Sequence, residues 1–142
     1  MGSEQVFEGC CLCGAVRWRT TGEPLYAYHC HCRMCQRQSG AAFLTGVTFP
    51  FDAVNWLRGE PCLHQSSESA KRGFCAQCGS WVSWQWFDEK ISLTAGSFDL
   101  PECIIPNYHV FTESQVPWIS IDDALPRYRR YPPEIGSQDQ EL

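Results

Sequence analysis

Three cysteines lie within six residues, at Cys30, Cys32 and Cys35, and this run constrains the chain more than any other feature. Successive side chains of a strand point to opposite faces, so a regular strand could not direct all three thiols to one place. A tight turn can wrap them around a single ion. Zn²⁺ binds thiolates at about 2.3 Å and prefers four ligands in a tetrahedron. Three local thiolates leave one position open, which is typical of a reactive rather than a structural zinc site.

Two further cysteine pairs, Cys11 with Cys13 and Cys75 with Cys78, each offer two ligands. Neither pair fills a tetrahedral site alone, but together they predict a closed four-sulfur zinc site, which is structural. Such a site would close a long loop of the chain and stabilise the fold. Cys10 is adjacent to Cys11 and is expected to point away from the ion. The isolated Cys62 and Cys103 are interpreted as packing residues.

The remaining ligand of the first site has several candidates. Water, an incoming thiol or a distant protein group could occupy the open position. His31 lies between two ligands and is expected to point away by alternation. His29 and His109 are the histidines that could contribute, although a packed strand histidine is the simpler interpretation of His109.

Ten cysteines in 142 residues could also form a disulfide framework. The first residues are polar rather than an apolar signal sequence, and the cysteines are spaced as metal ligands are. Zinc is therefore favoured over disulfides, and a cytoplasmic location is predicted. No run of 18 apolar residues suggests a membrane-spanning helix.

Composition limits the partners and the fold class. The formal net charge is -5 and only two lysines are present, which argues against general binding of nucleic acid or an anionic membrane. Six Trp, five Tyr and eight Phe favour a β-rich protein with large side chains on its sheets. We predict one mainly β domain over residues 1–131 and a polar tail over residues 132–142.

Alternating and apolar segments predict the strands, and no long amphipathic helix is apparent. The predicted strands cover residues 6–9, 15–21, 25–29, 41–49, 54–57, 62–65, 81–87, 91–95, 104–111 and 118–121, and residues 72–74 lead into the Cys75–Cys78 turn. Short helical turns are predicted at residues 36–40 and 122–125.

Five motifs together resemble the glutathione-dependent formaldehyde-activating enzyme family, which also includes the centromere protein V domain. They lie at residues 9–14, 30–35, 72–80, 96–99 and 106–109, the last followed by Pro117 and Trp118. The resemblance covers residues 6–131 and implies a β-tent fold of curved antiparallel sheets that zinc holds together. It also implies two zinc ions: a structural one on Cys11, Cys13, Cys75 and Cys78, and a catalytic one on Cys30, Cys32 and Cys35.

The activity that the resemblance implies is that of a carbon–sulfur lyase or synthase, which joins glutathione to formaldehyde as S-hydroxymethylglutathione. In this interpretation the substrate thiol takes the open zinc position and attacks the aldehyde. Arg33, Arg37 and Arg72 lie beside the cysteine turns and are the candidates to bind the glutathione carboxylates, with His109 as a further candidate at the site. Family members often carry a basic residue directly after the third cysteine, where this chain has Gln36.

Two other functions stay open at this stage. The chain could be a non-enzymatic binding module in which both zinc ions are structural, and a side chain completing the second site would favour it. It could also be a family member that acts on a different small substrate. Whether the protein forms a homo-oligomer is open as well.

Overall fold

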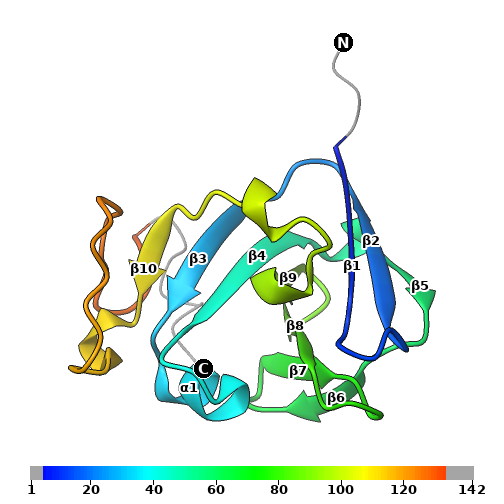
Figure 1. The fold of residues 1–142 in the computed structure, drawn as a ribbon, viewed down its shortest axis with the longest axis horizontal. Helices are drawn as coiled ribbons and strands as arrows, with labels where there is room; N and C mark the ends of the chain where they lie inside the picture. Colours follow the sequence, from blue (N-terminus) through cyan, green and yellow to red (C-terminus); the bar gives the residue numbers. More distant parts are fainter. Residues whose placement is uncertain (1–4, 134–142) are drawn as a thin grey trace.

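A computed structural model describes residues 5–133, and within them the chain is mainly β, as the sequence predicts (Figure 1). The strands are β1 (Val6–Cys10), β2 (Arg17–Thr21), β3 (Tyr26–Cys30), β4 (Leu44–Pro50), β5 (Val54–Arg58), β6 (Cys62–Gln65), β7 (Ala70–Phe74), β8 (Trp81–Trp86), β9 (Lys90–Thr94) and β10 (Tyr108–Val110). The helices are α1 (Arg33–Ser39) and the short 3₁₀ turns η1 (Phe51–Ala53), η2 (Ala95–Ser97), η3 (Pro101–Cys103) and η4 (Thr112–Ser114).

The strands form two sheets. A three-stranded sheet has the order β1-β2-β5, and a seven-stranded sheet has the order β10-β3-β4-β9-β8-β7-β6. The large sheet curves from β10 on one side of the molecule to β6 and β7 beneath β9, while β1, β2 and β5 stand at the opposite side (Figure 1). All neighbours pair antiparallel except β10, which runs parallel to β3. The prediction of antiparallel sheets therefore fails only at this short edge strand.

The main core lies between the two sheets. Trp18 of β2, Phe49 of β4 and Leu93 of β9 are each fully buried. Phe98 packs edge-on against Trp18, with 4.7 Å between the ring centroids. Buried aromatic side chains of this size remove large apolar areas from water, so this contact is a major part of what holds the small sheet onto the large one.

Some predicted elements differ from the structure. The helix begins three residues earlier than predicted, because Cys32 caps its N-terminus. The strand predicted over residues 104–111 is reduced to β10, and residues 118–121 and 122–125 form neither a strand nor a helix. Trp118 is exposed rather than packed. Pro106 lies in the first of these segments and Pro117 directly precedes the second, and proline removes a backbone donor that a strand needs.

The predicted division into a domain over residues 1–131 and a tail over residues 132–142 stays a prediction, since residues 1–4 and 134–142 lie outside the described part. Within residues 5–133, no helix has both the length and the apolar character needed to cross a membrane.

Gly9 is a position at which the sheets leave no room for a side chain. It bridges to Phe98, and an added Cβ would collide with the Ser97 carbonyl oxygen and the Trp18 ring. We expect Gly9→Ala to lower the free energy of unfolding by about 1–3 kcal/mol in urea titrations. Gly96→Ala is the control, because nothing lies within 4 Å of its added methyl, and it should change stability by less than about 0.5 kcal/mol. Equal effects of the two changes would contradict this packing assignment.

Candidate active site and metal centres

The structure brings Cys11, Cys13, Cys75 and Cys78 together, and we call them the four-cysteine cluster. Their sulfur atoms all lie within 4.8 Å of one another. The Sγ–Sγ distance is 3.7 Å between Cys11 and Cys13 and 3.8 Å between Cys13 and Cys75. A tetrahedron with zinc–sulfur bonds of about 2.3 Å has edges of about 3.8 Å, so this spacing fits one Zn²⁺ ion.

Two tight turns shape the four-cysteine cluster. The β1–β2 connection turns at Gly14 with φ of +82°, and the β7–β8 connection turns at Gly79 with φ of +78°. Backbone N–H groups point at the sulfurs: Val16 N lies 3.3 Å from Cys11 Sγ. The hydroxyl and amide of Ser80 lower the pKa of the Cys78 thiol to about 5, which favours the thiolate that a metal requires.

Cys30, Cys32 and Cys35 form the three-cysteine cluster, in which all three side chains are buried. Cys30 ends β3, Cys35 lies in α1, and Cys32 caps the helix by accepting the Cys35 N–H at 3.3 Å. The junction between strand and helix thus turns three thiols toward one point. Among the described residues, no further His, Cys, Asp or Glu places a ligand atom within 4.8 Å of all three sulfurs.

The three thiols cannot all ionise without a cation, because like charges at this spacing repel. Hydrogen bonds from Cys30 and Cys35 lower the pKa of Cys32 to about 3. The same contact with Cys32 raises the pKa of Cys30 well above its usual value. For Cys35, the hydrogen bond with Cys30 lowers the pKa, but the hydrogen bond with Cys32 and burial raise it, and the pKa is about 12. These shifts favour one thiolate and two thiols in the metal-free cluster, and a bound Zn²⁺ would supply the missing positive charge.

Arg72 is the cation that the fold places beside the three-cysteine cluster. Its side chain is buried, with Nη1 at 3.8 Å from Cys35 Sγ and 3.1 Å from Gln38 Oε1. The guanidinium also lies 5.2 Å from the centroid of the Trp81 ring. Its Nη2 is buried and has no hydrogen-bond partner among the described residues. Arg72 is thus not a solvated surface arginine, whereas Arg33 and Arg37 are exposed on α1.

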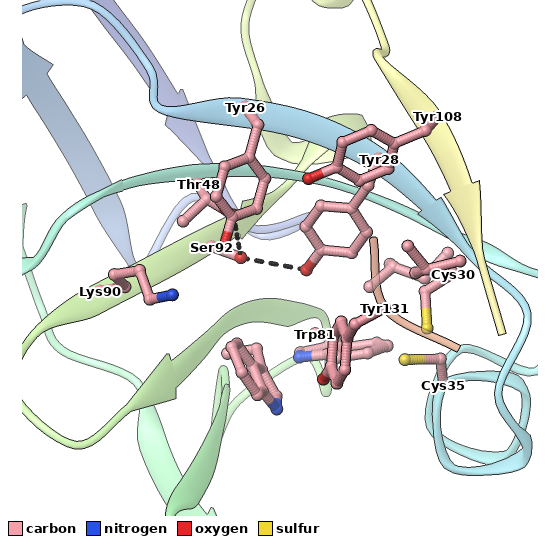
Figure 2. Close-up of a pocket in the computed structure, with 13 residues that line it drawn as sticks. Tyr26, Tyr28, Cys30, Cys35, Thr48, Trp81, Lys90, Ser92, Tyr108 and Tyr131 are labelled. Atoms are coloured by element: carbon pink, nitrogen blue, oxygen red, sulfur yellow. Dashed lines mark hydrogen bonds between the residues drawn. The ribbon is translucent and has the colours of Figure 1, made fainter. Parts of the chain in front are cut away.

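A small aromatic pocket opens beside this cluster, with Cys30 and Cys35 at one end and Lys90 toward the other (Figure 2). Its free volume is about 40 Å³. Its other lining residues are mainly aromatic: Tyr26, Tyr28, Leu44, Thr48, Trp81, Trp84, Ser92, Tyr108, Val110 and Tyr131. The Tyr28 hydroxyl donates to Ser92 Oγ at 3.0 Å, and Ser92 Oγ lies 2.7 Å from Thr48 Oγ1.

The sequence analysis missed most of this pocket. Tyr26 and Tyr28 share a strand face with Cys30, so alternation along residues 26–30 was a usable signal. Tyr108 and Tyr131 come from distant parts of the chain, and no local pattern indicates them. Trp81 joins Trp84 on the pocket side because the β7–β8 pairing shifts register between Gly73 and Phe74.

A wider groove lies next to the pocket. It has a volume of about 840 Å³ and shares the side chains of Leu44 and Trp81 with the pocket. The end of α1, the start of β4, the turn after Cys78 and the segment over residues 94–99 line it. Cys10, expected to be a bystander, lies partly buried along this groove.

His29, His31 and His109 lie together, away from the three thiols. His31 is fully buried, and its Nε2 lies 2.9 Å from Nδ1 of His109. His109 groups with His29 and Asp123 rather than with the three sulfurs. The predicted candidates for a histidine ligand of the second zinc therefore belong to a different cluster. Cys62 and Cys103 are exposed, so their interpretation as packing residues is wrong.

Cys78→Ser should remove one ligand of the enclosed ion and lower stability sharply, because metal binding to a closed site is coupled to folding. With one Zn²⁺ in each cysteine cluster, metal analysis should show the loss of one of two ions per chain, together with a clear drop in Tm. Cys62→Ser, on an exposed thiol outside both clusters, is the matched control and should change neither quantity. Unchanged stability of Cys78→Ser would contradict the structural assignment.

Zinc binding to the three-cysteine cluster should release about two protons near neutral pH, because Cys30 and Cys35 are protonated in the metal-free cluster and Cys32 is not. The measurement is calorimetry in buffers of different ionisation enthalpy. The sample is protein from which a mild chelator has removed only the second ion. Release of no protons would show that the three thiols are already ionised and would contradict this description.

Three comparisons relate this chain to known proteins. Residues 6–114 match the sequence model of the family described as glutathione-dependent formaldehyde-activating enzyme. A Halomonas elongata protein, provisionally described as such an enzyme, is 25% identical over 132 residues, which cover 82% of each chain. A crystal structure of a Rhodobacter sphaeroides protein has a similar fold, with a TM-score of 0.54 and 22% identity over 85% of this chain and 98% of that one. The match over most of the chain shows that this protein belongs to the glutathione-dependent formaldehyde-activating enzyme family.

Proposed function

We propose that the protein is a zinc-dependent carbon–sulfur lyase or synthase that joins a thiol such as glutathione to a small aldehyde such as formaldehyde. In this reaction a carbon–sulfur bond forms, and the thiol proton ends on the former carbonyl oxygen. The observation that carries the proposal is the position of the three-cysteine cluster: two of its thiols, Cys30 and Cys35, line a pocket with room for a very small molecule.

The pocket volume limits the aldehyde. A water molecule needs roughly 10–15 Å³ of such volume, so about 40 Å³ holds about three to four water-sized groups. Formaldehyde has two non-hydrogen atoms and fits, whereas a tripeptide does not. The larger thiol would therefore approach from outside, and the adjoining groove of about 840 Å³ is wide enough for it.

The charges around the cluster suit a thiolate. Bound at the three-cysteine cluster, Zn²⁺ would keep thiols ionised at neutral pH. Three thiolates and one Zn²⁺ leave one net negative charge, which the buried Arg72 guanidinium balances. Arg72 therefore acts through charge compensation in this proposal.

The pocket tyrosines can hold the proton that the product oxygen needs. Burial raises the pKa of Tyr28 and of Tyr131 well above the ordinary value, so both phenols stay protonated at neutral pH. A protonated phenol is a hydrogen-bond donor toward a carbonyl oxygen that gains negative charge. Gly46 lies directly against Tyr28, whose hydroxyl would be 2.7 Å from an added Cβ, so the backbone itself fixes this ring.

Contacts to glutathione beyond the thiol stay predictions. Arg33 and Arg37 are exposed on α1 and could meet a carboxylate, but neither lines the groove. A cytoplasmic location also stays a prediction; all ten cysteines are free thiols, which a reducing compartment maintains. Glutathione as the thiol, the absence of nucleic-acid binding and a homo-oligomer likewise stay predictions.

The alternative is a binding module in which both zinc ions are structural. It requires a fourth protein ligand at the three-cysteine cluster, and none is present among residues 5–133. This observation favours the enzyme. A family member with a different small substrate would use the same cluster and pocket, and it differs only in the thiol or carbonyl compound that it accepts.

Cys32→Ser should abolish turnover while leaving the fold largely intact, because the four-cysteine cluster is untouched. The rate of S-hydroxymethylglutathione formation, measured by NMR above the spontaneous reaction, should fall at least about 100-fold. The unfolding midpoint should shift by only a few degrees. Cys103→Ser, at an exposed thiol, serves as the control. Unfolding of Cys32→Ser would instead indicate a second structural ion, and full activity would exclude this cluster from catalysis.

A further inference from the structure

His29, His109 and Asp123 lie close together on the face of the large sheet opposite the aromatic pocket. His29 of β3 and His109 of β10 are direct partners in the parallel register, and their ring centroids are 4.7 Å apart. Asp123 comes from the following loop. One ligand atom from each of the three residues lies within 4.8 Å of the others. We call these residues the histidine–carboxylate group.

The two histidines are already oriented as metal ligands are. Nδ1 of His29 lies 2.7 Å from Thr45 Oγ1, and Nδ1 of His109 lies 2.9 Å from Nε2 of His31. Nε2 of His109 lies 2.9 Å from Asp123 Oδ2. Metal-binding histidines generally make such a second hydrogen bond through the nitrogen that does not bind the metal, which fixes the ring and its tautomer.

We propose that the histidine–carboxylate group is a third metal site of this chain, separate from both cysteine clusters and independent of the proposed reaction. Two imidazoles and one carboxylate suit a borderline divalent cation such as Zn²⁺, Co²⁺ or Fe²⁺, and they leave positions open for water. The ion can reach the group because the Asp123 side chain is 30% exposed, although His109 is fully buried.

The hydrogen bonds of the metal-free group allow a metal ion to replace a ring proton of His109. The Asp123 carboxylate accepts a hydrogen bond from the protonated Nε2 of His109, so Nδ1 of His109 accepts from Nε2 of His31. An ion would replace the proton on Nε2, and Nδ1 of His109 would then donate to His31. Nδ1 of His31 is buried and unpaired among the described residues, so it is free to carry the displaced ring proton.

Arg127 is a cation close enough to the site for its charge to act on His31. Arg127 bridges to His109 through the backbone, but its guanidinium donates to the Gln115 side chain. The sheet itself separates the group from the thiols, because Cys30 faces the pocket while its neighbour His29 faces away. An ion here would therefore have only nitrogen and oxygen ligands, which gives it a distinct spectrum.

The test is a Co²⁺ titration of the full chain after both cysteine clusters have been loaded with Zn²⁺ and excess metal removed. We expect one additional Co²⁺ per chain, with weak visible d–d bands and no thiolate-to-cobalt charge-transfer band. Asp123→Asn should weaken Co²⁺ binding at least about tenfold. Asp122→Asn, at the adjacent exposed carboxylate outside the group, should bind Co²⁺ as the wild type does.

Three results would overturn the proposal. They are no additional Co²⁺ at millimolar concentration, equal losses in Asp122→Asn and Asp123→Asn, and a thiolate charge-transfer band that shows exchange into a cysteine cluster. His29→Gln provides a second variant on a half-buried side chain, and it should lose the additional ion as well. Because activity is not the readout, failure of this proposal leaves the proposed enzyme function untouched, and the reverse also holds.

Discussion

The four-cysteine cluster is the constraint on which the rest of the structure depends. It joins the β1–β2 turn of the small sheet to the β7–β8 turn of the large sheet, with Cys13 and Cys75 separated by 62 positions in the chain. A metal that closes so long a loop removes much of the entropy of the unfolded chain. It also fixes the two sheets relative to each other around Trp18, and the groove beside the pocket runs along this junction.

Alternation along one strand divides the chemistry of the molecule. Tyr26, Tyr28 and Cys30 of β3 face the pocket, whereas His29 faces the opposite side with His109. The parallel partner β10 continues both faces, since Tyr108 and Val110 line the pocket as well. The thiol and imidazole side chains thus lie on opposite faces of the sheet, although Cys30 and His29 are adjacent in sequence.

Local patterns in the sequence predicted the cysteine ligand sets well and the pocket beside the three-cysteine cluster poorly. Metal spacing is a local property, so both cysteine clusters and most strands could be found without the fold. The pocket depends on Tyr108 and Tyr131, which reach it only through tertiary structure, and on a bulge that reorients Trp81. His109 was grouped with the thiols because distance along the chain says nothing about sheet faces. Only the pairing of β10 with β3 decides which face it occupies.

Arg72 links the charge of the site to the fold. A buried guanidinium is costly unless a negative group lies beside it, and a three-thiolate zinc site keeps one negative charge that needs a partner. Contacts among the thiols dominate the pKa values of Cys32 and Cys35, and the charge of Arg72 adds a smaller effect that favours both thiolates. The cluster in turn offsets the burial of Arg72. The position after the third cysteine is consequently free to be Gln36. Its amide donates to the His31 and Ser114 carbonyls and anchors α1 instead of contributing charge.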